Sequence, residues 1–199
     1  MFEVLKDMRI GCAMTGSFCT FAKVFAAWRA LGETGANLTP ILSPCSAASD
    51  TRFFPAEEVV RTLREITGKN PLVTLNEVEP IGPKKLLDLL IIAPCTGNTL
   101  GKLACGISDT PVLMAAKSHL RNGRPVLLAV STNDGLGRSA ESIGKLLAMK
   151  HIFFVPFGQD DCKGKPDSLV ADFNRLTAAA AEAIFERQIQ PVFCQNMYS

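Results

Sequence analysis

Residues 89–106 read LLIIAPCTGNTLGKLACG, and they predict a buried strand that runs directly into a helix. The apolar run at 89–93 is typical of a parallel strand that is covered on both faces. Small hydroxyl and amide side chains follow it, namely Thr96, Asn98 and Thr99. Free backbone N–H groups and the positive end of the helix dipole gather at such a junction, so an anion or a polar ring edge is favoured there.

A similar junction lies near the start of the chain. The predicted strand at 8–13 is followed by Thr15, Gly16 and Ser17, and a helix is predicted over 17–32 with Ser17 as its N-cap. Two junctions of this kind in one chain predict a cofactor that carries a phosphate group. Thr15-Gly16-Ser17 is not the glycine fingerprint of dinucleotide-binding proteins, so the motif does not indicate NAD.

Predicted strands and helices alternate along the whole chain. Strands are expected at 8–13, 37–43, 73–78, 87–93, 124–130 and 152–155. Helices are expected at 17–32, 55–67, 98–105, 110–121, 138–150 and 167–187. This alternation predicts an α/β protein, a three-layer sandwich around a doubly wound parallel sheet of the flavodoxin-like (Rossmann-like) kind. Residues 1–199 are expected to form a single domain, with about 188–199 as a C-terminal strap or a disordered tail.

Composition and charge argue against several classes of function. With 47% hydrophobic and 20% charged residues, the 199-residue chain is expected to be a soluble globular protein. Its net charge of +2 provides no strong field for nucleic acid or for a membrane surface. The N-terminus has no apolar segment of signal-peptide length, and the longest apolar stretch, 86–93, contains Asp88 and is too short to span a bilayer. A cytoplasmic protein is predicted.

The cysteines and histidines favour neither disulfides nor a metal site. Seven cysteines are an odd number, and they form no CxxC pair, so reduced thiols are expected, with Cys95 as a packing residue. Only His119 and His151 could supply imidazole ligands, so no metal site is predicted. Both histidines are expected to be surface or structural residues.

Four predicted strands end in polar residues that a parallel sheet brings to one rim. Besides 15–17 and 96–99, Ser43 follows the second strand and the segment STNDG follows the fifth, at 131–135. Taken alone, Thr15-Gly16-Ser17 could be a tight turn with a helix cap, and Asn98 could be a cap. Ser43 could begin a loop, and 131–135 could be an ordinary turn. Four such groups on one rim favour a ligand site.

These motifs resemble a known superfamily. Residues 15–17, and Ala93-Pro94-Cys95-Thr96-Gly97-Asn98-Thr99 followed by Gly106-Ile107-Ser108-Asp109, are similar to flavoproteins. That superfamily includes phosphopantothenoylcysteine decarboxylase, lantibiotic cysteine decarboxylases and flavin prenyltransferases. The similarity covers about residues 8–155, and it implies FMN as the cofactor.

The resemblance assigns the FMN phosphate to the first junction. Thr15, Gly16 and Ser17 would hold the phosphate, and Ser43 would lie beside the ribityl chain. Helix N-termini and hydroxyl groups suit a phosphate dianion.

The resemblance assigns the flavin ring to the second junction and to the end of the fifth strand. Thr96, Asn98 and Thr99 would face the phosphate and the ring. Ser131 and Asn133 would contact flavin or a substrate carboxylate. Asn98 and Asn133 are the best candidates for catalytic residues, since an amide suits the mixed donor and acceptor edge of a flavin.

At a finer level, the whole chain resembles the family of dipicolinate synthase B subunits from endospore-forming bacteria. Residues 94–99, 106–112 and 131–136 carry this likeness. It implies that the chain and a nucleotide-binding A subunit together dehydrogenate a small dicarboxylate, dihydrodipicolinate, to dipicolinate in the mother-cell cytoplasm. The hydride acceptor would be FMN here or NADP on the partner subunit. Relatives further imply a homo-oligomer based on trimers.

The two carboxylates of such a substrate need cationic or N–H partners. Lys102, Arg138 and Arg52 are the cationic candidates, together with the helix N-termini. No residue is identified as a general base.

Departures from the superfamily pattern bear on the alternatives. Residues 43–93 contain no histidine, whereas related cysteine decarboxylases use one from this region. Two methionines of those enzymes are missing around Asn133, and Ser131 stands where the prenyltransferases have a basic residue. An FMN-dependent decarboxylase or flavin prenyltransferase is the alternative function, and a non-catalytic flavin-binding subunit is a third.

Overall fold

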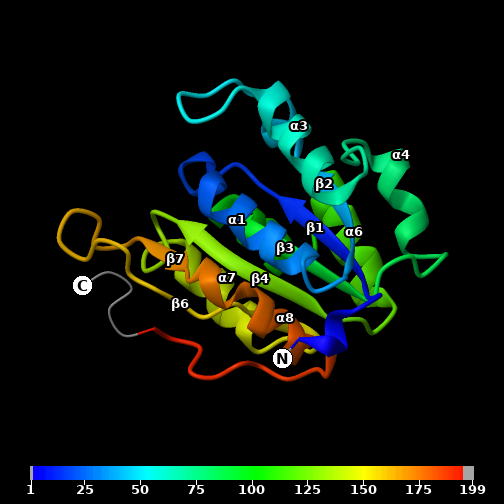
Figure 1. The fold of residues 1–199 in the computed structure, drawn as a ribbon. Helices are drawn as coiled ribbons and strands as arrows, with labels where there is room; N and C mark the ends of the chain where they lie inside the picture. The colour runs from blue at the N-terminus through cyan, green and yellow to red at the C-terminus, as the bar shows by residue number, and fades with distance from the viewer. Residues whose placement is uncertain (1, 195–199) are drawn as a thin grey trace.

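The structure, a computed structural model that describes residues 2–194, is built around one seven-stranded sheet (Figure 1). The strands are β1 (Arg9–Met14), β2 (Asn37–Leu42), β3 (Leu89–Cys95), β4 (Val126–Thr132), β5 (Ile152–Phe154), β6 (Phe157–Gly158) and β7 (Leu169–Ala171). β2, β1, β3 and β4 lie side by side in that order, and each pair is parallel. β5 extends the parallel set along the first half of β4.

The order of the strands creates a switch point between β1 and β3. The chain passes from β1 outward to β2 and later returns to β3 on the opposite side of β1. The carboxyl ends of β1 and β3 therefore flank the crevice in which doubly wound proteins bind their ligands. The predicted flavodoxin-like sandwich is confirmed, and five of the six predicted strands are present.

Helices cover both faces of this sheet. They are α1 (Phe21–Gly32), α2 (Pro44–Ala48), α3 (Ala56–Thr67), α4 (Leu75–Val78), α5 (Gly97–Ala104), α6 (Pro111–Arg121), α7 (Ser139–Leu147) and α8 (Leu176–Ile184). α1 and α8 pack together on one face, and α6 and α7 lie on the other (Figure 1). Short 3₁₀ turns occur at Glu3–Leu5, Phe18–Thr20, Glu79–Ile81 and Phe173–Arg175. Within residues 2–194, none of the helices has the length and apolarity to cross a membrane.

The central strands are buried because their sequences are apolar throughout. All seven residues of β3 are buried, as expected for a parallel strand with helices on both faces. Gly11 in β1 allows close packing, because a Cβ there would lie 2.6 Å from Leu87 Cδ1 and 2.7 Å from Leu90 Cδ1. α1 adds the fully buried Trp28 and Phe21 to this core.

The predicted strand at 73–78 is wrong. Only Leu72 pairs with the sheet, through a single bridge to Ile41. Thr74 instead begins α4 with a capping box, in which its side chain accepts from the Glu77 N–H and Glu77 accepts from the Thr74 N–H. The local helix-start signal therefore outweighed the β-branched residues of this segment.

The predicted helix at 167–187 is also too long. Leu169–Ala171 forms β7, which pairs antiparallel with β4 at Ser131 and Thr132, and β6 pairs antiparallel with β7. Asp172 then caps a 3₁₀ turn, and α8 begins at Leu176. The sheet is thus parallel except for this edge. The backbone of Phe157 in β6 bonds to Val192 and Cys194, so the C-terminal segment runs beside β6 as far as the described residues extend.

A charged cluster closes the amino end of the sheet. Asp88 accepts hydrogen bonds from Arg9 Nη2 at 2.6 Å, Arg9 Nε at 2.9 Å and Arg124 Nη1 at 3.0 Å. These bonds lower the pKa of Asp88 from 3.8 to about 2, and the hydrogen bond from the Arg9 side chain has the largest effect. His119 is buried nearby in α6, and its Nε2 has no hydrogen-bond partner within residues 2–194. The pKa of His119 is lowered to about 4, mainly because the side chain is buried and secondly because the positive charge of Arg124 lies near it.

The Asp88 cluster predicts acid-sensitive stability. Because the folded pKa of Asp88 lies below its unfolded value, its contribution is present at neutral pH and is lost as the pH falls from about 4 to about 2. Asp88→Ala should lower the free energy of unfolding by about 1–2 kcal/mol at pH 7, after allowance for partial exposure of the pair. Urea unfolding followed by circular dichroism measures this. Glu58→Ala, which removes an exposed pair with Arg61 at 3.8 Å, is the control and should cost under about 0.5 kcal/mol. A pH-independent deficit in Asp88→Ala would contradict the assignment.

The lowered pKa of His119 predicts a second acid-induced loss of stability, in a higher pH range than that of Asp88. Its lowered folded pKa means that the unfolded chain binds a proton first, so stability should fall as the pH drops from about 6.5 to about 4. The loss should reach about 3 kcal/mol in the wild type and be absent from His119→Met. His151→Asn is the control, since this histidine is half-buried beside Glu186 and should leave the loss in place. Equal pH profiles for wild type and His119→Met would disprove the prediction.

Candidate functional site

A cavity of about 390 Å³ opens at the carboxyl end of the sheet, within the size range of small-molecule sites. It is lined by residues that follow β1, β2 and β3 and by the start of α6. These are Thr15, Gly16, Ser43, Pro44, Cys45, Thr96, Asn98, Thr99, Thr110 and Leu113. Six of the residues that the sequence singled out therefore lie around one space, as the fold requires of neighbouring parallel strands.

The Thr15 hydroxyl ties the ends of β1 and β3 together. Its Oγ1 donates to the carbonyl oxygen of Pro94 at 2.8 Å and accepts from the N–H of Thr96 at 3.1 Å. The N–H of Thr15 donates to the same Pro94 oxygen at 3.2 Å. Thr15 is buried, so these bonds are shielded from water and hold the two junctions in register.

Three helices begin at this cavity, and each has a hydroxyl cap that lines it. Ser43 accepts from Ser46 N–H, Thr96 accepts from Thr99 N–H, and Thr110 accepts from Leu113 N–H. α5 and α6 are long enough to carry an appreciable dipole, so their positive ends lie beside the cavity. The surroundings therefore favour an anion or a carbonyl oxygen.

Asn98 is not the cap of α5. Thr96 has that role, and Asn98 is the second residue of the helix, exposed at the cavity. Its side-chain amide forms no hydrogen bond with any residue in the described range. The amide is thus available to a ligand, and the alternative of a mere cap is excluded.

Ser17 differs from its prediction as an N-cap. A 3₁₀ turn at Phe18–Thr20 precedes α1, and the Ser17 side chain makes no capping bond. Its hydroxyl instead lies 2.7 Å from the hydroxyl of Ser131, so the ends of β1 and β4 are joined across the rim. Ser17 follows the lining residue Gly16 directly, but Ser17, Ser131 and Asn133 do not themselves line the cavity. Asn133 is exposed in the turn after β4.

The cationic candidates do not reach the cavity. Lys102 Nζ lies 2.6 Å from Asp109 Oδ2, and the Arg52 guanidinium stacks on the Phe53 ring at 4.8 Å. Arg138 contributes, after hydrogen bonds from Thr132 and Ser139, to lowering the pKa of the Asp134 carboxyl, and it is likewise absent from the lining. Recognition in this cavity therefore depends on hydroxyl, amide and backbone groups.

Burial makes Cys95 a packing residue, as expected. It is fully buried in β3, and burial raises the pKa of its thiol far above the usual range. A buried neutral thiol is a poor nucleophile.

Four lining residues were missed by the sequence reasoning, namely Pro44, Cys45, Thr110 and Leu113. Thr110-Pro111 is a helix-start signal of the same kind as Ser43-Pro44, because proline is favoured at the first helical position. That pattern could have indicated a third helix start, but not its place beside the cavity, since α6 reaches it only through tertiary packing.

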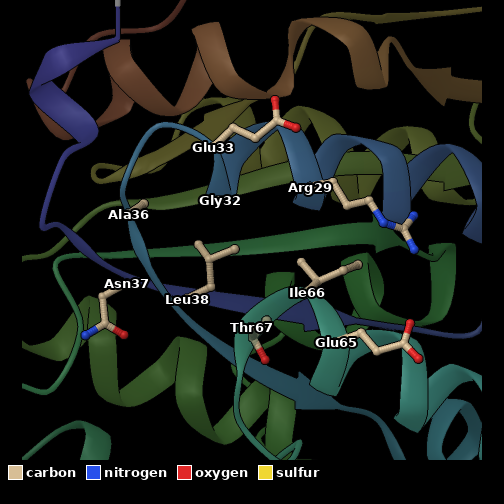
Figure 2. Close-up of a pocket in the computed structure, with 9 residues that line it drawn as sticks. All are labelled: Arg29, Gly32, Glu33, Ala36, Asn37, Leu38, Glu65, Ile66 and Thr67. Atoms are coloured by element: carbon tan, nitrogen blue, oxygen red, sulfur yellow. The ribbon is translucent and has the colours of Figure 1, made fainter.

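A larger hollow of about 480 Å³ lies at the other end of β2, between the C-terminal parts of α1 and α3 (Figure 2). Leu38 and Ile66 provide apolar surface there, and Arg29, Glu33 and Glu65 carry charges of both signs. None of the predicted site residues lines it. It lies away from the switch point, so the smaller cavity is the candidate site.

Comparisons with known proteins identify the family of the chain. The flavoprotein family model matches residues 3–173. The B subunit of dipicolinate synthase from Bacillus subtilis (strain 168) is 42% identical over 192 residues, which cover 96% of both chains. The crystal structure of the dipicolinate synthase B subunit from Bacillus halodurans C matches with a TM-score of 0.88 and 40% identity, and covers 96% of this chain and 98% of that one.

More distant structures share the fold. A dodecameric FMN-dependent Ubix-like decarboxylase from Escherichia coli O157:H7 matches with a TM-score of 0.65 at 21% identity, over 91% of this chain and 96% of that one. The family match spans most of the chain, and the Bacillus relatives match over nearly their full length. The chain therefore belongs to the flavoprotein family and, within it, to the family of dipicolinate synthase B subunits.

Proposed function

We propose that this chain binds FMN in the cavity at the carboxyl end of the sheet and acts as the B subunit of a dipicolinate synthase. The observation that carries the proposal is the convergence of Thr15, Thr96, Thr99 and Asn98 at the switch point, beside the starts of α5 and α6. Family membership and the FMN-dependent relatives support it.

The donor set fits the cofactor. Hydroxyls and helix starts suit a phosphate dianion, and the unengaged Asn98 amide suits a ring edge that both donates and accepts hydrogen bonds. The FMN-binding residues of the proposal are Thr15, Gly16, Ser17, Ser43, Thr96, Asn98, Thr99 and Ser131. Asn98 and Asn133 are the candidates for contact with the reacting ring or with a substrate carboxylate.

The reaction would remove two electrons and two protons from dihydrodipicolinate and so aromatise its ring. When bound, FMN can accept the hydride. NADP on a nucleotide-binding A subunit is the other possible hydride acceptor. In this reaction the cavity would hold the ring edge through Asn98. It would also keep water away from the buried Thr15 and Thr99 hydroxyls. In this proposal the active unit forms only with the partner subunit.

Assembly and location form part of the same proposal. Residues 1–199 would form one flavoprotein-like domain in a homo-oligomer based on trimers, located in the cytoplasm of the mother cell of a sporulating bacterium. The dodecameric relative supports a homo-oligomer.

Decarboxylation of cysteine peptides gains no support from the site. No histidine is among the residues that line the cavity within 2–194, and residues 43–93 contain none at all. The isolated chain should therefore release no CO2 from a cysteine peptide, as measured by product mass. Release at an enzymatic rate would favour the decarboxylase alternative.

Flavin binding is tested by titration of the purified protein with FMN, followed by quenching of flavin fluorescence. Ser17→Asp places a negative charge where the phosphate is proposed, and it should weaken binding by about 1–3 kcal/mol. Thr177→Asp, at a half-exposed position on α8, is the control and should bind as the wild type does. No binding by the wild type would overturn the proposal, whereas equal affinity of Ser17→Asp would remove Ser17 from the site.

Catalysis is tested with the A subunit, dihydrodipicolinate and NADP, by the ultraviolet absorbance of dipicolinate. Asn98→Ala should reduce turnover about tenfold or more, since loss of one hydrogen bond to a charged or reacting group costs about 1.5–3 kcal/mol. Its unfolding free energy should hardly change, because Thr96 is the cap. Asn76→Ala, exposed on α4, is the matched control. Full activity without any partner would refute the subunit assignment and indicate a self-sufficient flavoenzyme.

A further inference from the structure

Gly97, the first residue of α5, is in close contact with polar side chains from the end of β4, the turn after it and the start of α7. A Cβ at this position would lie 2.6 Å from Ser139 Oγ, 2.7 Å from Thr132 Oγ1 and 2.8 Å from Asp134 Oδ1. Real Cβ atoms essentially never approach other atoms so closely. Only glycine fits at 97 while these three side chains keep their positions.

One carboxylate oxygen holds the other two side chains in place. Asp134 Oδ1 accepts from Ser139 Oγ at 2.8 Å and from Thr132 Oγ1. These two hydrogen bonds lower the pKa of Asp134, and the one from Thr132 has the larger effect. The carboxylate is therefore ionised at neutral pH. The carbonyl oxygen of Asp134 also accepts from the N–H groups of Gly137 and Ser139. The whole turn between β4 and α7 is thus organised around Asp134.

The turn is confined on its other side as well. A Cβ at Gly135 would lie 2.6 Å from Leu169 Cγ in β7, and the N–H of Leu136 donates to the Asp167 carbonyl at 3.0 Å. The turn that carries Asp134 therefore cannot move away from Gly97 without displacing β7. The antiparallel edge of the sheet presses the turn against the start of α5.

α5 carries three lining residues of the cavity in and around its first turn. Thr96 is the cap, Asn98 is exposed at the cavity, and Thr99 donates its N–H to Thr96 Oγ1 at 3.3 Å. Asp134 does not line the cavity, but its carboxylate lies beside the positive end of α5, where a negative charge is favoured.

We propose that Asp134 is a positioning residue, which fixes the first turn of α5 through its contact with Gly97 and thereby orients Asn98 and Thr99 in the cavity. The effect on FMN affinity rests on the proposed function. The effect on α5 itself is a property of the ligand-free chain and is measured separately.

The first test is hydrogen–deuterium exchange of ligand-free protein, read by mass spectrometry in peptides that cover 96–104. Asp134→Ala should speed exchange of this segment about tenfold, because the amides of Thr99 and Leu100 bond to Thr96 in the turn that is released. Asp134→Asn keeps an acceptor oxygen of the same shape and should stay within about threefold of the wild type. Asp172→Ala removes a similar cap from the 3₁₀ turn before α8, and it is the control that should leave 96–104 unchanged. Wild-type exchange in Asp134→Ala would overturn the proposal.

The second test is a double-mutant cycle between positions 97 and 134. Gly97→Ala alone should speed exchange in 96–104, since the new methyl group meets side chains that Asp134 holds. In Gly97→Ala/Asp134→Ala, the hydroxyls of Thr132 and Ser139 are free to rotate, so the double variant should exchange more slowly than the product of the two single effects predicts. Strictly additive effects would contradict the contact on which the proposal depends.

FMN titration completes the set and separates the two hypotheses. Asp134→Ala should bind FMN about tenfold more weakly than the wild type and Asp134→Asn nearly as well, a loss of about 1.4 kcal/mol for the alanine variant. If the wild type binds no FMN, the proposed function fails and the exchange data alone decide whether Asp134 positions α5. If the wild type and Asp134→Ala bind FMN equally, Asp134 has no role in orienting the cavity residues.

Discussion

The hydroxyl of Thr15 joins the ends of the two strands on which the site depends. It donates to the Pro94 carbonyl and accepts from the Thr96 N–H, and its burial protects both bonds. The order of the strands brings β1 and β3 together, but their ends could still splay apart by an ångström or more. A satisfied buried hydroxyl removes that freedom, since parting the strands would leave a polar group without a partner at a cost of about 1–3 kcal/mol. The positions of Thr96, Asn98 and Thr99 all follow from this junction.

The two ends of the sheet have different electrostatic characters. At the amino end, Asp88, Arg9 and Arg124 form a network of full charges that stabilises the fold. At the carboxyl end, the cavity lining within residues 2–194 carries hydroxyls, an amide and a thiol, and no Lys, Arg, Asp or Glu. The charged Asp134 lies behind the cavity, against Gly97. The stabilising charges are thus kept apart from the surface offered to a ligand.

The sequence predicted those parts of the structure that depend on local pattern. Buried strands such as Leu89–Cys95, the helix starts after them, and the gathering of Thr15, Ser43, Thr96 and Asn98 on one rim follow from apolar runs, turn residues and the geometry of parallel sheets. The predictions were wrong where tertiary contacts determine the local structure. Leu169–Ala171 is a strand only because the edge of β4 at Ser131–Thr132 is open to it. The bond between the Ser17 and Ser131 hydroxyls joins residues 114 positions apart, and no spacing rule could have shown it.

The neutral lining of the cavity decides which forces can bind an anion there. A helix end contributes about 0.3–1 kcal/mol toward a nearby negative charge, so α5 and α6 together supply at most about 2 kcal/mol in an open site. Hydrogen bonds from hydroxyl or amide donors to a charged group contribute about 1.5–3 kcal/mol each. Two or three such bonds exceed the helix ends, so the placement of donors matters more than the dipoles. A donor moved by an ångström gives up most of its bond, whereas a dipole hardly responds to so small a shift. Thr15 and Asp134 hold the donors in place, and they are therefore as important to recognition as the donors themselves.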